Sequence, residues 1–378
     1  MKTPVAQILL PLFALLFFSA VAASAGQELV FVGSGKKDIE AFRFDPATGA
    51  LSSLGQAAAL AHPSFLAIAP NRRFLYAISE GGRPEDSSVS AFAIDRTSGK
   101  LSLLNSQPAG GGAGPCHVEV DASGKNALIA NYGSGSVAVF PLAANGELGP
   151  VSAFVQDSGS SVNPQRQEGP HAHCIVTDPG DRFAFVCDLG LDKVMIFAFD
   201  SSKGTLTPAH APFVAVAPGA GPRHIAFHPN GRWAYVINEM GSTITSFAYD
   251  ADRGGLREIQ TESTLPKDFS GQSTCAEVAV HPSGRFVYGS NRGDDSIAVF
   301  TCDPSTGRLA FAQRVSTGGK TPRQFEIDPT GNWLLAANQD SGTVVVFRID
   351  TSNGHLRPVG APVPSANPQC VKFLPAEP

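Results

Sequence analysis

Histidine residues that could carry out acid–base chemistry stand close together in the segment Gly169-Pro-His-Ala-His-Cys174 of this 378-residue chain. His171 and His173 are separated by one residue, which is a spacing that metal-binding histidines also show. No third ligand stands in clear register with them, so we expect no metal site here. We interpret these histidines as a general base or as hydrogen-bonding groups.

Arginines that could bind anions follow in later segments of similar character. Arg223 is followed by His224 and Glu239, and Arg292 and Arg323 come later in the chain. A guanidinium group fits a carboxylate or phosphate because its N–H donors form a planar fork. These arginines are therefore either ordinary surface charges or the anion-binding groups of a site. Beside them, a carboxylate or imidazole could activate water for attack on an ester.

Two repeated turns indicate the elements that must position these residues. The first turn, Asp followed by polar residues, Gly and Leu, occurs seven times, starting at Asp45, Asp95, Ala143, Asp200, Asp250, Asp303 and Asp350. The second turn, of Pro-x-Gly-Arg type, lies between apolar segments and ends at Arg73, Lys125, Arg182, Arg232, Arg285 and Asn332. Four short strands per unit predict an all-β fold, a seven-bladed β-propeller with four antiparallel strands in each blade.

The two ends of the chain are expected to share the last blade. Its second, third and fourth strands match Leu29 to Gly33, Ile39 to Phe44 and Leu51 to Ala57, and its first strand matches Gln369 to Leu374. In the alternative, an unclosed solenoid, the two ends of the chain do not meet, so a unit shared between them is not expected. An aromatic residue recurs at one position of the blade and is interpreted as packing between blades, at Phe74, Phe183, Trp233, Phe286 and Trp333.

Aligned on these turns, the blades differ most at one rim of the channel. The start of each first strand carries Ser64, Cys116, His173, Arg223, Ala276, Arg323 and Gln369. The end of each second strand carries a Ser, Asn or Asp, including Asn238 and Asn291, and is followed by Glu80, Tyr132, Leu189, Glu239, Arg292 and Gln339. Antiparallel neighbours bring these positions to one face, which longer loops such as Asp157 to Gly169 also enter. Departures from a repeat mark a site, although the asparagines alternatively only cap turns.

The N-terminus resembles a secretory signal. An apolar run from Ile8 to Phe18 is followed by Ala23 and Ala25, the small residues that a signal peptidase reads. We therefore predict a signal peptide over residues 1–25, cut near Ala25, and a single propeller domain over residues 26–378 that is periplasmic or secreted. The net charge of −5, without a block of like charge, excludes nucleic acid and an anionic membrane surface as expected partners. We expect a monomer that acts on a small molecule.

Six cysteines occur in this chain, and none of them forms a C-x-x-C pair. In an exported protein this pattern allows disulfides and makes a zinc site unexpected. Cys174 and Cys187 flank one predicted hairpin turn. They are either a disulfide pair or small buried residues.

Several of these segments together resemble the seven-bladed propeller lactonases, a family that includes propeller-type 6-phosphogluconolactonases and fungal carboxymuconate cyclases. The matching motifs are Gly169-Pro-His-Ala-His-Cys174, Gly221-Pro-Arg-His224, Tyr235-Val-Ile-Asn-Glu239, Asn291-Arg-Gly293 and Thr321-Pro-Arg323, and the resemblance extends from Gln27 to Leu374. It implies a lactone site that needs no metal or cofactor. Its catalytic His, two Arg and Glu would fall on His173 or His171, Arg223, Arg292 and Glu239.

We therefore predict a lactonase that hydrolyses a sugar lactone such as 6-phosphogluconolactone or a related acidic lactone, or forms one by cyclisation. Glu239 or His173 would activate water, and Arg223 with Arg292 would hold the substrate anion or the oxyanion. Further substrate contacts are expected from His171, Arg323, His224, Asn238, Asn291 and Gln339. The alternative is an exported propeller without catalysis that binds a small anion or a protein partner.

Overall fold

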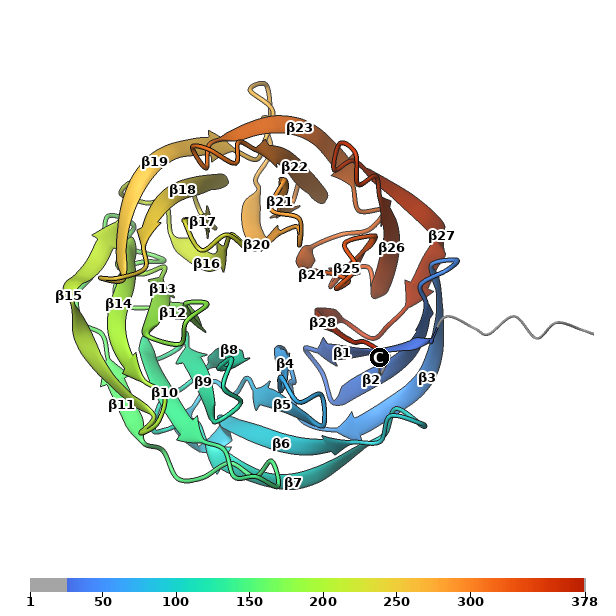
Figure 1. The fold of residues 1–378 in the computed structure, drawn as a ribbon, viewed down its shortest axis with the longest axis horizontal. Helices are drawn as coiled ribbons and strands as arrows, with labels where there is room; N and C mark the ends of the chain where they lie inside the picture. The colour runs from blue at the N-terminus through green and yellow to red at the C-terminus, as the bar shows by residue number, and fades with distance from the viewer. Residues whose placement is uncertain (1–25, 377–378) are drawn as a thin grey trace, which may run out of the picture.

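Seven blades surround a central channel in the computed structural model, which describes residues 26–376 (Figure 1). Each blade is a four-stranded antiparallel sheet, so the predicted all-β, seven-bladed propeller is confirmed. The predicted signal peptide, residues 1–25, lies outside the described residues. Within the described part the helical structure is one short 3-10 turn, η1 (Pro84–Asp86), and no helix there is long and apolar enough to cross a membrane.

The strands of six blades follow one another along the chain, from the channel outward. Blades 1 to 3 consist of β4 (Leu66–Ile68), β5 (Phe74–Ser79), β6 (Ser88–Ile94) and β7 (Leu101–Pro108); β8 (Pro115–Val120), β9 (Asn126–Asn131), β10 (Ser136–Pro141) and β11 (Ala153–Gln156); and β12 (Ala172–Thr177), β13 (Phe183–Asp188), β14 (Lys193–Asp200) and β15 (Thr205–Ala215). Blades 4 to 6 consist of β16 (Pro222–Phe227), β17 (Trp233–Asn238), β18 (Thr243–Asp250) and β19 (Gly255–Ser263); β20 (Thr274–Val280), β21 (Phe286–Arg292), β22 (Ser296–Cys302) and β23 (Leu309–Ser316); and β24 (Pro322–Ile327), β25 (Trp333–Asn338), β26 (Thr343–Ile349) and β27 (Leu356–Pro364).

Blade 7 joins the two ends of the chain, as predicted from the split repeat. Its strands are β28 (Pro368–Leu374), β1 (Glu28–Ser34), β2 (Asp38–Asp45) and β3 (Ala50–Ala59). β28 pairs antiparallel with β1 and places Leu374 opposite Leu29 and Cys370 opposite Gly33. The hydrogen bonds of this pair close the ring, so that β1 and β28, the first and last strands of the described residues, are both paired.

The core lies between neighbouring blades, and the recurring aromatic residues cover a glycine of the next blade. A Cβ on Gly307, in the turn before β23, would lie 2.6 Å from the Trp233 ring of blade 4. The same contact is made by Phe74 on Gly146, Phe183 on Gly254, Phe286 on Gly354 and Trp333 on Gly49. The predicted packing between blades is therefore confirmed, and it explains why this repeated turn keeps a glycine.

All six cysteines are buried free thiols. Cys174 on β12 and Cys187 on β13 lie opposite each other in the sheet without a disulfide. Of the two interpretations of this pair, the structure confirms that the cysteines are small buried residues and not a disulfide pair.

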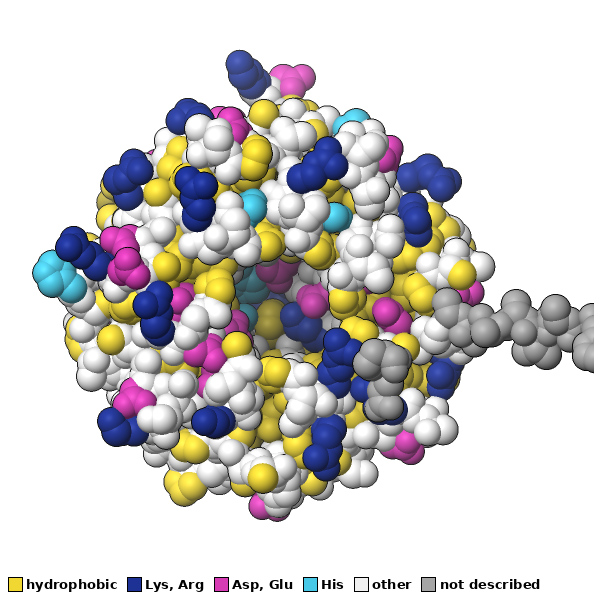
Figure 2. Space-filling view, viewed as in Figure 1, with side chains coloured by type: hydrophobic (Ala, Val, Ile, Leu, Met, Phe, Trp, Pro, Cys, Tyr) yellow, Lys and Arg dark blue, Asp and Glu magenta, His cyan; other side chains and the backbone are white. Residues whose placement is uncertain are grey.

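The channel opens on both faces of the ring. Figure 2 shows the face at which β28 ends, with the mouth hollowed and with acidic, basic and histidine side chains inside it. The rim that the sequence analysis singled out lies at the opposite end, because its residues begin the first strands and end the second strands. The ring thus presents two different polar mouths.

Candidate functional site

β-Bulges at the start of the first strands direct the variable side chains. The strand register shifts at Cys116 in β8, His173 in β12, Arg223 in β16 and Arg323 in β24. A bulged residue is left out of the ladder of hydrogen bonds, and its side chain is re-aimed relative to the strand. In each of these blades the bulge therefore falls on the position at which the repeat diverges in sequence.

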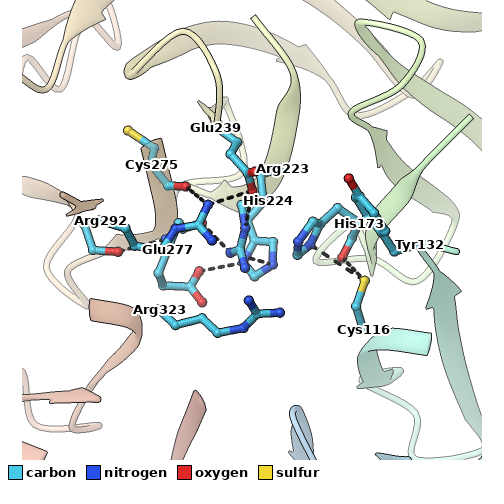
Figure 3. A network of polar contacts seen from close by, with 12 residues as sticks. Cys116, Tyr132, His173, Arg223, His224, Glu239, Cys275, Glu277, Arg292 and Arg323 are labelled. Atoms are coloured by element: carbon cyan, nitrogen blue, oxygen red, sulfur yellow. Dashed lines mark hydrogen bonds and ion pairs between the residues drawn. The ribbon is translucent and has the colours of Figure 1, made fainter. Parts of the chain in front are cut away.

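Glu239 is the centre of the charged network at this end of the channel (Figure 3). It follows β17 directly, is 5% exposed, accepts hydrogen bonds from the guanidinium groups of Arg166 and Arg223, and forms an ion pair with that of Arg292. Its Oε2 lies 3.1 Å from Arg223 Nε and 2.8 Å from Arg292 Nη2, and its Oε1 lies 2.7 Å from Arg166 Nη2. Burial opposes ionisation, but these three positive charges outweigh it and lower the pKa of Glu239 to about 2. Glu239 is a carboxylate at any physiological pH.

Arg166 was missed by the sequence analysis. It stands in the long loop between β11 and β12, where its Nη2 also donates to Tyr132 Oη at 3.2 Å. The loop is held to blade 3 by the fully buried Gln167, whose amide donates to Leu189 O at 2.9 Å. A loop outside the repeat has no equivalent residue in the other blades to compare with. The only sequence signal was the length of this loop and the face that it enters.

His173 is a buried, neutral imidazole. Cys116 Sγ donates to the His173 backbone oxygen at 3.2 Å, and the ring stands edge-on to Tyr132 and His224 with centroid distances of 5.5 and 5.2 Å. Burial, reinforced by the charge of Arg223, lowers the pKa of His173 well below its usual value. An unprotonated ring nitrogen is therefore available near neutral pH.

These residues enclose a cavity of about 220 Å³, lined by Glu80, Cys116, Tyr132, Arg166, His173, Glu239, Arg292 and Arg323. Arg323 makes a long ion pair with Glu80 at 3.9 Å, and its side chain is 20% exposed. The Nε of Arg292 is buried without a hydrogen-bond partner. With Arg223 behind the wall, four guanidinium groups face two carboxylates, an excess of two positive charges. Such a cavity is suited to a small anion.

The other predicted site residues lie around this cavity rather than on its wall. Arg223 is 2% exposed and donates to Ala276 O at 2.6 Å, and His224 lies behind it. His171 stacks on Tyr132 with a centroid distance of 4.4 Å and contacts its backbone oxygen at 2.9 Å. His171 therefore supports a wall residue from behind.

The three predicted amide contacts are also absent from the cavity wall. Asn238 donates to the hydroxyls of Thr243 and Thr245, and Asn291 donates to Ser296. These bonds brace the turn after each second strand, which agrees with the plainer role that the sequence left open for the asparagines. Gln339 belongs to blade 6, where its backbone oxygen accepts from Asn367. The structure does not bring these three side chains to the candidate site.

The arrangement combines cations, a neutral imidazole and a small polar cavity, which are the groups that ester hydrolysis uses. Among residues 26–376 no group of three or more His, Cys, Asp or Glu side chains is arranged to hold a metal ion. The cavity itself offers His173 as a proton acceptor and guanidinium donors that could stabilise an oxyanion.

Comparison with known proteins gives consistent results over nearly the whole described chain. The family model described as "Lactonase, 7-bladed beta-propeller" matches residues 29–373. A 6-phosphogluconolactonase of Bacillus subtilis is 39% identical over 295 residues, which cover 78% of this chain and 82% of that protein. Among solved structures, a putative 6-phosphogluconolactonase from Bacteroides fragilis has a TM-score of 0.87 at 33% identity and covers 93% of this chain and 99% of its own. The periplasmic gluconolactonase of Pseudomonas aeruginosa has a TM-score of 0.86 at 32% identity and covers 92% and 99%.

Proposed function

This chain belongs to the seven-bladed β-propeller lactonase family, as its motifs predicted, and from this premise we propose that it hydrolyses a sugar lactone bearing an acidic group. The reaction class, hydrolysis of a lactone, is that of the family and of its relatives named 6-phosphogluconolactonase. The observation that carries the finer proposal is the cavity, where Arg166, Arg292 and Arg323 surround a neutral His173. A substrate such as 6-phosphogluconolactone would supply an anion that balances the excess positive charge of this cavity.

His173 is the better candidate for the general base. Both carboxylate oxygens of Glu239 are engaged by arginines, whereas the neutral His173 lines the cavity and has an unprotonated ring nitrogen. In the proposed step, water attacks the lactone carbonyl and gives a proton to a His173 ring nitrogen. The same proton then goes to the ring oxygen as the C–O bond breaks, which leaves the open-chain acid.

The arginines would stabilise negative charge at two places. The unpartnered Arg292 Nε is available to the oxyanion that develops on the carbonyl, and Arg323 is available to the acidic group of the substrate. Glu239 keeps Arg166, Arg223 and Arg292 in place by forming an ion pair with each of them. Its proposed role is to position these cations rather than to move protons.

Export of the chain is part of the proposal. It is supported by the signal-like residues 1–25 and by the likeness to a structural neighbour that is named as a periplasmic gluconolactonase. An exported enzyme meets lactones outside the cytosol, where unphosphorylated acidic lactones are further candidate substrates. Cell fractionation with N-terminal sequencing of the mature protein tests this, with cleavage after Ala25 expected and an intact Met1 contradicting it.

The test of the activity is a panel of phosphorylated, acidic and neutral sugar lactones, with acid release followed against the spontaneous rate in buffer. We expect the wild-type protein to accelerate hydrolysis of the anionic lactones and Arg323→Ala to raise their KM by about tenfold or more. Arg72→Ala is the matched control, because Arg72 lies by the opposite mouth on a Pro-x-Gly-Arg turn. No wild-type rate above buffer on any lactone would refute the proposed function.

A further inference from the structure

Behind Arg223 lies a buried pair, His224 and Glu277, that the proposed mechanism does not use. His224 on β16 is 4% exposed and Glu277 on β20 is 8% exposed. Glu277 Oε1 lies 3.0 Å from His224 Nδ1, and the opposite ring nitrogen, Nε2, lies 3.3 Å from Arg223 Nη1. A series of contacts thus connects Glu239 through Arg223 and His224 to Glu277 (Figure 3).

The contact with Arg223 shows which nitrogen of His224 carries the proton. A guanidinium group can only donate, so Nε2 must accept and must therefore be unprotonated. The proton of the neutral ring is then on Nδ1, from where it is donated to Glu277. We propose that Glu277 is a positioning residue, which fixes this tautomer of His224 and thereby holds Arg223 in the place where it anchors Glu239. The catalytic consequence of this inference rests on the proposed function, but the tautomer does not.

Arg223 needs this support because its surroundings are unfavourable for a cation. Burial and the charges of Arg292 and Arg323 lower its pKa to about 10. Three acceptors compensate: Glu239 Oε2, Ala276 O and His224 Nε2. If the proton of His224 moved to Nε2, one acceptor would become a donor pointing at another donor, and Arg223 would have to move.

Glu277 is reached from the other mouth of the channel, not from the candidate active site. It lines a separate cavity of about 270 Å³ together with His224, His117 of β8, Glu326 of β24 and Lys372 of β28. This cavity is part of the polar interior on the face seen in Figure 2. The remaining charged neighbour is Arg223 itself. The pair thus lies on the side of Arg223 that faces away from the candidate active site.

The environment of Glu277 predicts a pH dependence. Burial raises the pKa of Glu277 to about 7, and the charges of Lys372 and Arg223 oppose this only in part. Above pH 7 the carboxylate accepts the Nδ1 proton and Arg223 is held in place. Below pH 7 a protonated Glu277 can donate to Nδ1, so that the proton of His224 shifts to Nε2. Activity should therefore fall as the pH drops through about 7.

The experiment compares Glu277→Gln with Glu119→Gln in the full chain. Glu119 is the matched control because burial also raises its pKa to about 7, but its carboxylate accepts from Thr177 instead of a histidine. The tautomer of His224 is read from ¹⁵N spectra of the histidine rings, and the arginine cavity is probed with inorganic phosphate by calorimetry. Lactone hydrolysis is measured from pH 5 to 9, and thermal unfolding checks that each variant is folded.

We expect wild-type His224 to be protonated on Nδ1, and Glu277→Gln to increase the Nε2-protonated form and to weaken phosphate binding. We also expect kcat to fall about tenfold with a smaller change in KM, and the fall in activity below pH 7 to disappear. Glu119→Gln should change none of these. Nε2 protonation in the wild type, or an unchanged tautomer, phosphate affinity and pH profile in Glu277→Gln, would overturn the inference. Because the spectra and the phosphate titration do not depend on turnover, an inactive wild type would refute the proposed function alone.

Discussion

A single carboxylate organises the cations at the rim. Two unit charges 4 Å apart interact with about 4 kcal/mol at an effective dielectric constant of 20, so neighbouring guanidinium groups repel each other substantially. Glu239 offsets this by forming ion pairs with Arg166, Arg223 and Arg292. Arg166 differs from the other two because it comes from a loop and its side chain is 40% exposed. Of the three arginines, Arg166 can therefore turn from Glu239 to an arriving anion at the lowest cost in free energy.

Replacing Arg166 by glutamine tests this difference. Loss of one charged hydrogen bond to the substrate, worth about 1.5 kcal/mol, should raise the KM for an acidic lactone about tenfold and leave that for a neutral lactone nearly unchanged. Arg83→Gln is the control, since Arg83 also stands in a loop but pairs with exposed Glu85 and Asp86. An equal change in KM for both classes of lactone would show that Arg166 only shapes the cavity.

At the level of single residues, sequence divergence between blades was a good guide to position. It singled out Cys116, His173 and Arg323 because each sits on a bulge, where the strand ladder no longer dictates the side chain. It could not separate wall residues from those behind the wall, such as Arg223, because both occupy the same position in the repeat. The comparison between blades could not identify Arg166, because the loop that carries it has no counterpart in other blades.

At the level of elements, the contact between an aromatic ring and a glycine turn joins five of the seven pairs of neighbouring blades. In blade 4, Trp233 lies on the Gly307 turn of blade 5 and beneath the guanidinium of Arg232, which is 4.9 Å from the ring centroid. Turn glycine, aromatic residue and arginine all recur along the chain, so the sequence repeat predicted both the strands and their packing. The blades differ from one another in the rim residues and where loops differ in length.

Gly307→Ala should destabilise the fold through this contact. The added Cβ would meet the Trp233 ring at 2.6 Å, and residue 307 has a positive φ of 71°. We expect a loss of about 2–4 kcal/mol in the free energy of unfolding, from backbone strain and overpacking together. Gly231→Ala is the control, because Gly231 has a φ of 68° but no atom near its Cβ position. Its free energy of unfolding, measured in urea, should fall by only about 1 kcal/mol. Equal losses in the two variants would show that the contact with the Trp233 ring does not contribute to stability.

For the whole molecule, closure of the ring depends on one strand. Deleting residues 365–378 removes β28 and leaves β1 and blade 6 without their neighbour at the channel. Because an opened ring exposes strand edges and the faces between blades, we expect loss of cooperative unfolding and aggregation at modest concentration. A shorter deletion, residues 375–378, keeps β28 and should melt like the full chain. Cooperative melting of the longer deletion would show that blade 7 holds without its inner strand.

Two buried carboxyl groups, whose pKa values are shifted in opposite directions, lower the stability of the ring at acidic pH and at alkaline pH, respectively. The lowered pKa of Glu239 contributes stability that is present above pH 4.5 and is lost as the pH falls through about 2. Burial raises the pKa of Glu119 to about 7, so its contribution is present below pH 4.5 and is lost as the pH rises through 7.

Glu119→Gln imitates the protonated carboxyl. It should therefore match the wild type in urea unfolding at pH 4.5, where Glu119 is protonated in the folded chain. At pH 8 the wild type must either bury an ionised carboxylate or hold it protonated, so the variant should exceed it by roughly 1–3 kcal/mol. The comparison is the difference in unfolding free energy between the two proteins at the two pH values. A difference that is the same at pH 4.5 and pH 8 would mean that Glu119 titrates alike in the folded and unfolded chain, and that the channel interior is wetter than its burial implies.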